Sequence, residues 1–166
     1  AEANELAQLL IYGESQTREP IYNATASRHG GNEIGDTGIE ISIDQQHMWF
    51  YKDGALYADT NIVTGDSGDG YDTPRGSYKV LNRLTDIVLK GEERDGSTYE
   101  SPVSFWLGFK GSAYGIHDAS WRGDSQSGYG GSIYQYNGSH GCVNTPYSIM
   151  QRIFNAVEVN TPVLIY

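Results

Sequence analysis

The sequence predicts a mostly-β domain, a β-sandwich or barrel-like fold with one helix in its C-terminal half. Short apolar or alternating segments recur between turn residues from position 39 to 110 and again at the C-terminus. Glycine and tyrosine are abundant, with 21 and 13 copies in 166 residues, and these residue types favour turns and strands. Only one later stretch, residues 146–157, has extended helical periodicity.

The first 36 residues are expected to lie outside this β domain. Ala1 to Leu10 places its leucines on one face of a short helix, and polar, irregular sequence follows as far as Asp36. We therefore interpret residues 1–36 as the end of a preceding domain and a linker, and residues 37–166 as one domain.

Three strands are predicted at the start of the domain. Isoleucines alternate with other residues from Ile39 to Ile43, as in a half-buried strand. His47–Lys52 and Leu56–Thr64 are the next two strands, and Asp53-Gly54 between them is a strong signal for a tight hairpin turn.

A loop rich in glycine and aspartate, Gly65–Gly76, leads into the middle of the domain. Ser77–Arg83 and Asp86–Lys90 are then predicted as strands. A polar turn through Asp95-Gly96 follows, and the aromatic segment Thr98–Lys110 is predicted to be extended.

The helix is predicted from Pro146 to Val157. Its apolar residues recur at helical spacing: Ile149, Met150, Ile153, Phe154 and Val157. Thr145 is expected to be the N-cap and Pro146 the first helical residue. Pro162–Tyr166 is expected to close the fold as an apolar strand.

Composition narrows the classes of function. A net charge of −10 makes nucleic acid and anionic membranes poor partners. The single cysteine excludes an internal disulfide. The sequence contains no signal peptide or hydrophobic span, so an export signal, if the protein acts outside the cytoplasm, is expected in a part of the protein beyond this sequence.

The candidate chemistry is concentrated in the segment Gly138–Asn144. It holds the only cysteine, Cys142, two residues after His140. An imidazole within reach can take the thiol proton, and a helix starting just beyond the cysteine would favour a thiolate. Backbone N–H groups around Gly141 and Cys142 are candidates for an oxyanion hole. His140 is close in sequence, so the upstream His117 is the better candidate base.

These residues resemble a known family. Ser139–Asn144, with the sequence SHGCVN, resembles the signature of the L,D-transpeptidase catalytic domain (YkuD type), and Gly115–Asp118 resembles its upstream histidine motif. Thr73–Gly76 and Thr161–Val163 also match segments that such domains carry. The resemblance covers residues 37–166 and implies the same fold.

The resemblance implies a peptidoglycan L,D-transpeptidase that forms 3-3 cross-links and needs no cofactor. Cys142 would attack the carbonyl between the third and fourth residues of a donor tetrapeptide stem, expel D-alanine, and pass the acyl group to an acceptor amine. His117 would be the base, oriented through the backbone carbonyl of Asp118. The supporting residues would be His140, Gly141, Ser139, Asn144 and Asp118.

The same resemblance implies where the protein works and what inhibits it. The location would be the bacterial cell wall or the outer face of the cytoplasmic membrane. The partners would be donor and acceptor stem peptides, and carbapenem-type β-lactams would acylate Cys142. Tyr114, Trp121 and Tyr136 flank the motifs and are candidates for a substrate groove.

One segment departs from the family pattern. Residues 118–138 separate the two motifs by a few more positions than the pattern has. The surplus is expected in Arg122–Gly128, which is small and polar enough to bulge as a loop.

Several alternatives remain at this stage. An L,D-carboxypeptidase would use the same acyl-enzyme and give it to water, and a non-catalytic wall-binding module would use the motif residues structurally. Papain-like and NlpC-type peptidases place the cysteine before the histidine, opposite to the order here. A zinc site made from His117, Asp118, His140 and Cys142 is a further alternative, as is a buried structural cysteine.

The loop after residue 64 also carries two weaker motifs. Gly65–Gly68 matches part of the nucleophile signature of chymotrypsin-like proteases, but Asp69 replaces the glycine that would follow. Asp66, Asp69 and Asp72 are possible calcium ligands, although they lack EF-hand spacing. Ordinary turn chemistry is the favoured interpretation of both.

Overall fold

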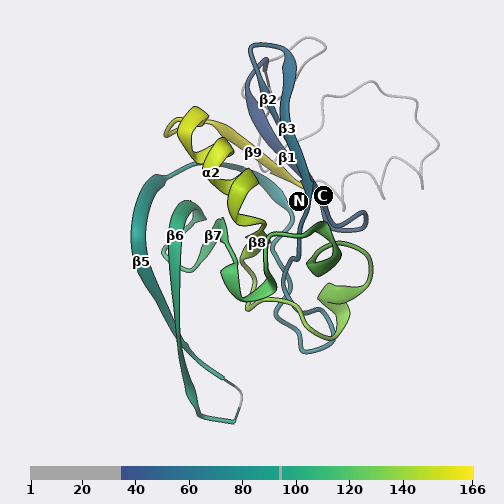
Figure 1. Cartoon of the computed structure of the whole chain (residues 1–166), viewed down its shortest axis with the longest axis vertical. Helices are drawn as coiled ribbons and strands as arrows, with labels where there is room; N and C mark the ends of the chain where they lie inside the picture. Colours follow the sequence, from purple (N-terminus) through teal and green to yellow (C-terminus); the bar gives the residue numbers. More distant parts are fainter. Residues whose placement is uncertain (1–34, 94) are drawn as a thin grey trace, which may run out of the picture.

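The computed structural model describes residues 35–93 and 95–166. The helix and linker predicted for residues 1–36 lie almost entirely outside these residues. The described part of the chain forms two β-sheets and one α-helix, as the sequence predicts (Figure 1).

The first sheet has five strands in the order β3-β2-β1-β9-β4. Strands β1 and β9 are parallel, and the other neighbours are antiparallel. The C-terminal strand β9 therefore lies inside the sheet, between β1 and β4. The strand bounds are Gly38–Ser42 (β1), His47–Lys52 (β2), Ala55–Asn61 (β3), Gly76–Lys79 (β4) and Pro162–Ile165 (β9).

The predicted Asp53-Gly54 turn joins β2 to β3. Both residues have positive φ, 52° and 80°, which matches the hairpin turn that this dipeptide favours. Strand β3 ends at Asn61 rather than at the predicted Thr64. The chain beyond it leaves the sheet, and Val63 pairs in an isolated bridge with Asn144.

The second sheet has four strands in the order β5-β6-β7-β8. Their bounds are Asn82–Glu92 (β5), Thr98–Lys110 (β6), Tyr114–Asp118 (β7) and Val143–Thr145 (β8). Strands β5 and β6 form a long hairpin that projects from the rest of the domain (Figure 1). The bounds of β6 match the sequence prediction.

The prediction of separate strands at Ser77–Arg83 and Asp86–Lys90 was wrong, because one long strand, β5, runs through most of this region. The chain is one strand through Asp86, which has a φ of 52° at the break in pairing between Thr85 and Ile87. The first predicted strand instead divides between β4 and β5. Pairing with the long β6 strand keeps β5 continuous through this local irregularity.

The helix also begins later than predicted. Helix α2 spans Tyr147–Ala156, Thr145 is the last residue of β8, and Pro146 flanks the helix without a side-chain cap. The carboxylate of Asp124 instead accepts the backbone N–H of Ser148 at 2.9 Å. Helix α2 contacts β3 of one sheet and β6 and β7 of the other, so it joins the two sheets.

The hydrophobic core takes side chains from both sheets and the helix. The most deeply buried members include Ile39, Ile41, Phe50, Leu107, Ile116, Val143, Met150, Ile153, Val163 and Ile165. Burial of these side chains supplies the main driving force for folding, and it fixes the strands that carry the candidate site.

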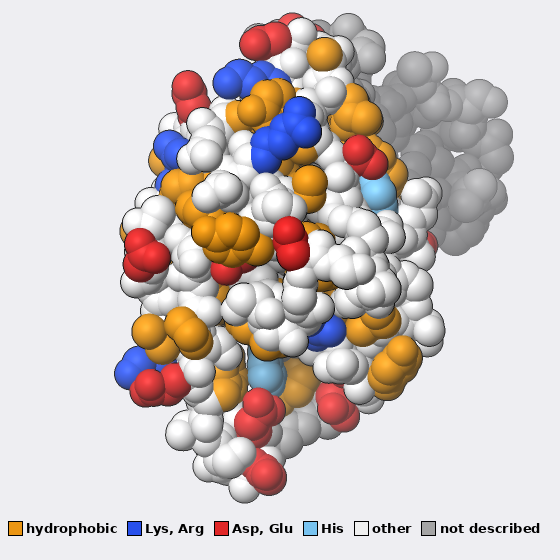
Figure 2. Space-filling view, in the orientation of Figure 1, with side chains coloured by type: hydrophobic (Ala, Val, Ile, Leu, Met, Phe, Trp, Pro, Cys, Tyr) orange, Lys and Arg blue, Asp and Glu red, His pale blue; other side chains and the backbone are white. Residues whose placement is uncertain are grey.

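No helix in the described ranges is long and apolar enough to cross a membrane. The face in Figure 2 carries acidic side chains along its length, while basic side chains gather mostly toward the end that holds β2 and β3.

Candidate active site

The parallel pairing of β7 with β8 brings the two sequence motifs together. His117 is the register partner of Asn144, and Ile116 is the partner of Val143. Register partners point to the same face of a sheet, and residues two apart in an extended segment share that face. Cys142, just before β8, is therefore on the same side as His117 and Asn144, and all three line one pocket of about 190 Å³.

The pocket contains most of the residues predicted from sequence and several that were not. His117, Trp121, Ser139, His140, Cys142 and Asn144 were predicted, and Gly138 begins the segment singled out from the sequence. The residues that were not predicted are Leu89, Glu93, Tyr99, Ser101, Arg122 and Asn137. Four of the additional residues come from the β5–β6 hairpin. Its position over the site depends on tertiary packing, for which the local sequence has no signal.

His117 is held by its own strand and by two tryptophans. It is 2% exposed, and its Nδ1 lies 2.9 Å from the carbonyl oxygen of Asp118, the contact that the family resemblance implied. Trp106 stacks on the ring at 5.8 Å, and Trp121 lies at 5.9 Å on a tilted plane. Burial lowers the pKa of His117, against the smaller opposing effect of the Asp118 carbonyl, so the ring is neutral at pH 7.

The thiol of Cys142 lies against the start of β7. Its Sγ donates to the carbonyl oxygen of Ala113 at 3.4 Å. Burial raises the pKa of Cys142 to about 11, and a hydrogen bond from the backbone N–H of Gly115 lowers it only in part. The free domain therefore holds a thiol and a neutral imidazole rather than an ion pair.

The predicted role of the helix N-terminus in favouring a thiolate is not supported. Strand β8 and Pro146 separate Cys142 from the first residue of α2, Tyr147. The helix-dipole effect falls off within about one turn, and Asp124 already accepts an N–H of that first turn.

A tight turn presents the cysteine. Gly141 has a φ of 111°, and an added Cβ would lie 2.6 Å from Cε1 of Tyr114. The hydroxyl of Ser139 accepts the N–H of Gly141 at 3.0 Å and donates to the carbonyl of Cys142 at 2.5 Å. Thr73 donates to the Gly141 carbonyl at 2.9 Å. The N–H of Gly141, predicted as an oxyanion donor, is thus already hydrogen-bonded to Ser139.

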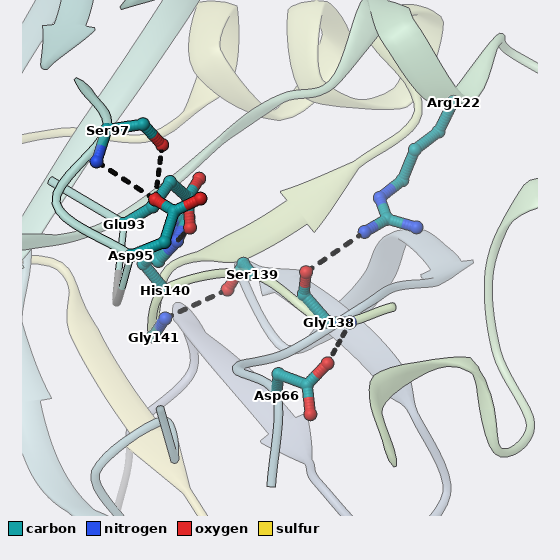
Figure 3. Close-up of polar contacts among 9 residues, drawn as sticks. All are labelled: Asp66, Glu93, Asp95, Ser97, Arg122, Gly138, Ser139, His140 and Gly141. Atoms are coloured by element: carbon teal, nitrogen blue, oxygen red, sulfur yellow. Dashed lines mark hydrogen bonds and ion pairs between the residues drawn. The ribbon is translucent and has the colours of Figure 1, made fainter. Parts of the chain in front are cut away.

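Asp66 supports the segment that leads into this turn. One carboxylate oxygen accepts the N–H of Gly138 at 3.0 Å, and the other accepts the N–H of Asp69 at 3.1 Å. Figure 3 shows the first of these contacts. The Gly65–Gly68 motif therefore contributes an aspartate that supports the segment leading to Cys142.

His140 connects the loop to the β5–β6 hairpin. Its Nε2 lies 2.9 Å from a carboxylate oxygen of Glu93 (Figure 3). Tyr99 stacks on the ring at 4.6 Å, and Tyr71 meets it edge-on at 4.8 Å. His140 therefore holds the hairpin tip beside the pocket. In Figure 3, His140 and Arg122 lie on opposite sides of the Gly138–Ser139 segment.

The long segment between the motifs is folded onto the domain. It contains three short 3₁₀ turns, Ser120–Arg122, Gln126–Gly128 and Ile133–Gln135. The Gln126 side chain accepts the N–H of Asn61 at 3.0 Å, which fixes the segment to the end of β3. The predicted bulge at Arg122–Gly128 thus carries regular turns and hydrogen bonds.

The three aromatic residues predicted to form a substrate groove lie in three different settings. Trp121 lines the pocket. Tyr114 packs beneath Gly141, and Tyr136 is 71% exposed, and neither belongs to the pocket lining. Tyr114 therefore supports the turn that carries Cys142. The sequence could not show which of the three aromatic residues lines the pocket, because the 3₁₀ turns between the motifs interrupt any simple periodicity.

Within residues 35–93 and 95–166, the structure does not arrange side chains as the zinc alternative requires. No group of three or more His, Cys, Asp or Glu side chains there is arranged to hold one metal ion. The carboxylate of Asp118 accepts the backbone N–H of Phe105 at 2.7 Å instead.

Two buried side-chain atoms have no hydrogen-bond partner among the described residues: Nε of Arg122 and Oδ1 of Asn144. Both side chains line the pocket that holds Cys142. Buried polar atoms are nearly always hydrogen-bonded in folded proteins, so these two are candidate contacts for a bound molecule.

Comparison with known proteins agrees with this geometry. The sequence profile of the L,D-transpeptidase catalytic domain (YkuD) matches residues 36–165. A search of curated proteins found no match. Among solved structures, the chain is similar to the catalytic domain of the Enterococcus faecium L,D-transpeptidase determined by NMR, with 44% identity over 79% of this chain and 97% of that one and a TM-score of 0.67.

Longer relatives match as well. A crystal structure of a mutant Enterococcus faecium L,D-transpeptidase is 39% identical over 98% of this chain, with a TM-score of 0.72. This chain spans 62% of the length of that relative. L,D-transpeptidase 3 from Mycobacterium tuberculosis has the same fold at 20% identity, with a TM-score of 0.67. From the profile match and these identities, the chain belongs to the L,D-transpeptidase catalytic domain family.

Proposed function

We propose that this domain is a peptidoglycan L,D-transpeptidase that forms 3-3 cross-links through a thioester on Cys142. The observation that carries the proposal is the placement of His117 and Cys142 on one face of the β7–β8 pair, in a shared pocket. Because a carbonyl oxygen can only accept, the contact with Asp118 places the hydrogen of neutral His117 on Nδ1. Nε2 then carries the lone pair that a general base needs.

Acylation is the first half of the proposed reaction. Sγ of Cys142 attacks the carbonyl carbon between the third and fourth stem residues while Nε2 of His117 takes the thiol proton. The backbone N–H of Cys142 stabilises the oxyanion, since that of Gly141 is already bonded to Ser139. The C–N bond then breaks, His117 returns the proton to the leaving amine, and D-alanine departs.

Transfer is the second half. The acceptor amine attacks the thioester carbonyl and loses a proton to Nε2 of His117. The C–S bond breaks, and the sulfur of Cys142 recovers the proton as a thiol. Cys142 is again a thiol and His117 is again neutral, as before the reaction. The product is an amide bond between two stems. No cofactor takes part in either half.

The protonation states support general-base catalysis. Burial raises the pKa of Cys142 to about 11 and lowers that of His117. Neutral thiol and neutral imidazole are thus both present at pH 7, and the proton moves as the C–S bond forms. A thiolate buried before substrate arrives would be costly in this setting.

The proposal extends to inhibitors and location. One similar structure is described as an avibactam carbamoyl enzyme and another as an Enterococcus faecium catalytic domain acylated by ertapenem. By similarity, carbapenem-type β-lactams acylate Cys142 here. The domain, residues 37–166, works outside the cytoplasm at the cell wall on donor and acceptor stems, with residues 1–36 belonging to a preceding domain and linker.

Product analysis tests the proposal. The protein is incubated with disaccharide-tetrapeptide stems beside a Cys142→Ala variant, and the products are read by mass spectrometry. Cross-linked dimers that have lost one D-alanine, absent with the variant, are expected. Tripeptide without dimers would instead identify an L,D-carboxypeptidase, and intact stems in both samples would favour a wall-binding module.

A further inference from the structure

Arg122 lines the pocket and has no carboxylate partner among the residues that the structure describes. Its guanidinium donates to the backbone carbonyl of Asn137 at 2.6 Å. It also donates to that of Gly138 at 3.4 Å, the contact that Figure 3 shows. It forms no ion pair with any carboxylate of residues 35–93 and 95–166. These carbonyl contacts orient the group but do not neutralise its charge.

The side chain of Arg122 is half-buried, and no carboxylate of the described residues compensates its charge. Its Nε is buried without a hydrogen-bond partner among the described residues, and burial lowers the pKa of Arg122. Burying a charge is costly unless it is paired. Planar guanidinium groups bind carboxylates with two parallel hydrogen bonds, so a ligand carboxylate fits this position.

The second unpartnered atom complements the first. Oδ1 of Asn144 is a buried acceptor in the same pocket. One donor group with positive charge and one amide acceptor match the two ends of an acylated amino acid, a carboxylate and an N–H. The C-terminal residue of a stem peptide has both.

The shared pocket of Arg122 and His117 indicates which carboxylate of the donor stem Arg122 would bind. Arg122 and His117 line the same pocket, and the charge of Arg122 contributes, after burial, to lowering the pKa of His117. The leaving nitrogen must lie at Nε2 of His117 to receive its proton. In a C-terminal D-alanine the carboxylate is attached to the carbon next to that nitrogen. A cation in the same pocket as the proposed base is therefore suitably placed for the terminal carboxylate.

The opposite end of the pocket carries the opposite charge. Glu93 lines the pocket from the hairpin, and Figure 3 shows it across the Gly138–Ser139 segment from Arg122. A donor carboxylate is repelled from the Glu93 end and attracted to the Arg122 end. The charges thus set the direction in which the donor lies.

We propose that Arg122 binds the C-terminal carboxylate of the donor stem and so selects donors that end in a free D-alanine. This inference rests on the proposed function and names a specificity-determining residue for it. Asn144 accepts the N–H of the same D-alanine.

The test compares two donors that differ only at this carboxylate. Tetrapeptide stems with a free C-terminus and with a C-terminal carboxamide are cleaved by the wild type, by Arg122→Met and by Arg122→Lys. A charge-assisted hydrogen bond changes kcat/KM by roughly 10- to 100-fold. The wild type is expected to prefer the free carboxylate by that factor. Arg122→Met should bring the ratio of the two kcat/KM values close to one, and Arg122→Lys should give an intermediate ratio.

The ratio separates carboxylate binding from general support of the loop. If Arg122 only positions Asn137 and Gly138, both donors lose kcat/KM equally and the preference remains, which would overturn the inference. A third donor, amidated at the stem glutamate instead, keeps the terminal carboxylate, so its kcat/KM relative to the unamidated donor should be the same in the wild type and both variants. A change of that ratio on substitution of Arg122 would also overturn the inference. If Arg122→Met does not fold, Arg122→Lys supplies the same comparison. Failure of the wild type to cleave any donor would refute the proposed function itself, and this inference with it.

Discussion

The Nδ1 atom of His117 lies 2.9 Å from the backbone carbonyl oxygen of Asp118, the next residue in the same strand. The proposed base is therefore oriented by the main chain, and the Asp118 carboxylate is used elsewhere, as an acceptor for the N–H of Phe105. This differs from a Ser-His-Asp triad, in which a carboxylate holds the imidazole.

Replacing the Asp118 carboxylate should therefore cost little activity. In Asp118→Asn the amide oxygen can still accept from Phe105, and the backbone carbonyl that orients His117 is retained. The rate of acylation by a carbapenem should fall by less than about 10-fold, against roughly 10⁴-fold when the aspartate of a triad is amidated. Stopped-flow or intact-mass kinetics measure this, and a triad-sized loss would show that the carboxylate takes part directly.

The pH dependence of acylation should follow His117. Only the neutral imidazole accepts a proton, and burial lowers the pKa of this group from its ordinary value of about 6.5. The rate should therefore be on its plateau at pH 7 and decline only as the pH falls below about 6.5. The rate of acylation by a carbapenem, measured from pH 4.5 to 8, tests this decline. A midpoint above pH 7 would contradict a buried, neutral base.

Cys142 should react slowly with simple alkylating agents. Because burial raises its pKa to about 11, the thiolate fraction at neutral pH is below that of a free thiol near 8.5. Iodoacetamide labelling should be slower than that of glutathione at pH 7.5 and still rising above pH 9. A plateau near neutral pH would instead reveal a preformed thiolate–imidazolium pair. Slow alkylation alone does not separate an enzyme from a wall-binding module, whereas acylation by a carbapenem does.

Gly141→Ala should impair both stability and acylation. The residue has a φ of 111°, and the new methyl group would lie 2.6 Å from the ring of Tyr114. Backbone strain of this kind costs on the order of 1–3 kcal/mol, and relief of the contact displaces the cysteine. Gly131→Ala is the matched control, since Gly131 has a φ of 58° and an added Cβ meets nothing within 4 Å.

Thermal unfolding and carbapenem acylation distinguish these two glycine variants. Gly131→Ala should lower the free energy of unfolding by about 1 kcal/mol and leave acylation intact. Gly141→Ala should lose more stability and most of its acylation rate. Equal effects in the two variants would mean that the turn at Cys142 has no special geometric requirement.

The parts of the fold predicted correctly are those with strong local signals. Asp53-Gly54 specifies a hairpin turn by its own backbone preference, and the aromatic segment Thr98–Lys110 forms a strand of the predicted length. Cys142 and His117 were chosen from residue type, motif and family resemblance, and their catalytic roles stay predictions. The structure adds the β7–β8 pairing that places them in one pocket.

The errors arise where tertiary contacts decide. Strand β8 has only three residues, Val143–Thr145, and a Thr-Pro pair is a strong local signal for a helix start, so the prediction placed the helix there. Pairing with β7 makes Thr145 a strand residue instead. Arg122 and Glu93 lie in polar segments without periodicity, and only the folding of the loop and the hairpin over the site brings them to the pocket.

The most direct test of the central claim is intact-protein mass spectrometry after incubation with a carbapenem. Wild type, His117→Gln and Cys142→Ala are compared over time, and the modified peptide is sequenced. We expect one adduct on the wild type at Cys142, none on Cys142→Ala, and acylation slowed by roughly 10²- to 10⁴-fold in His117→Gln. An adduct at another residue, or unchanged acylation in His117→Gln, would contradict the pairing of Cys142 with His117 as nucleophile and base.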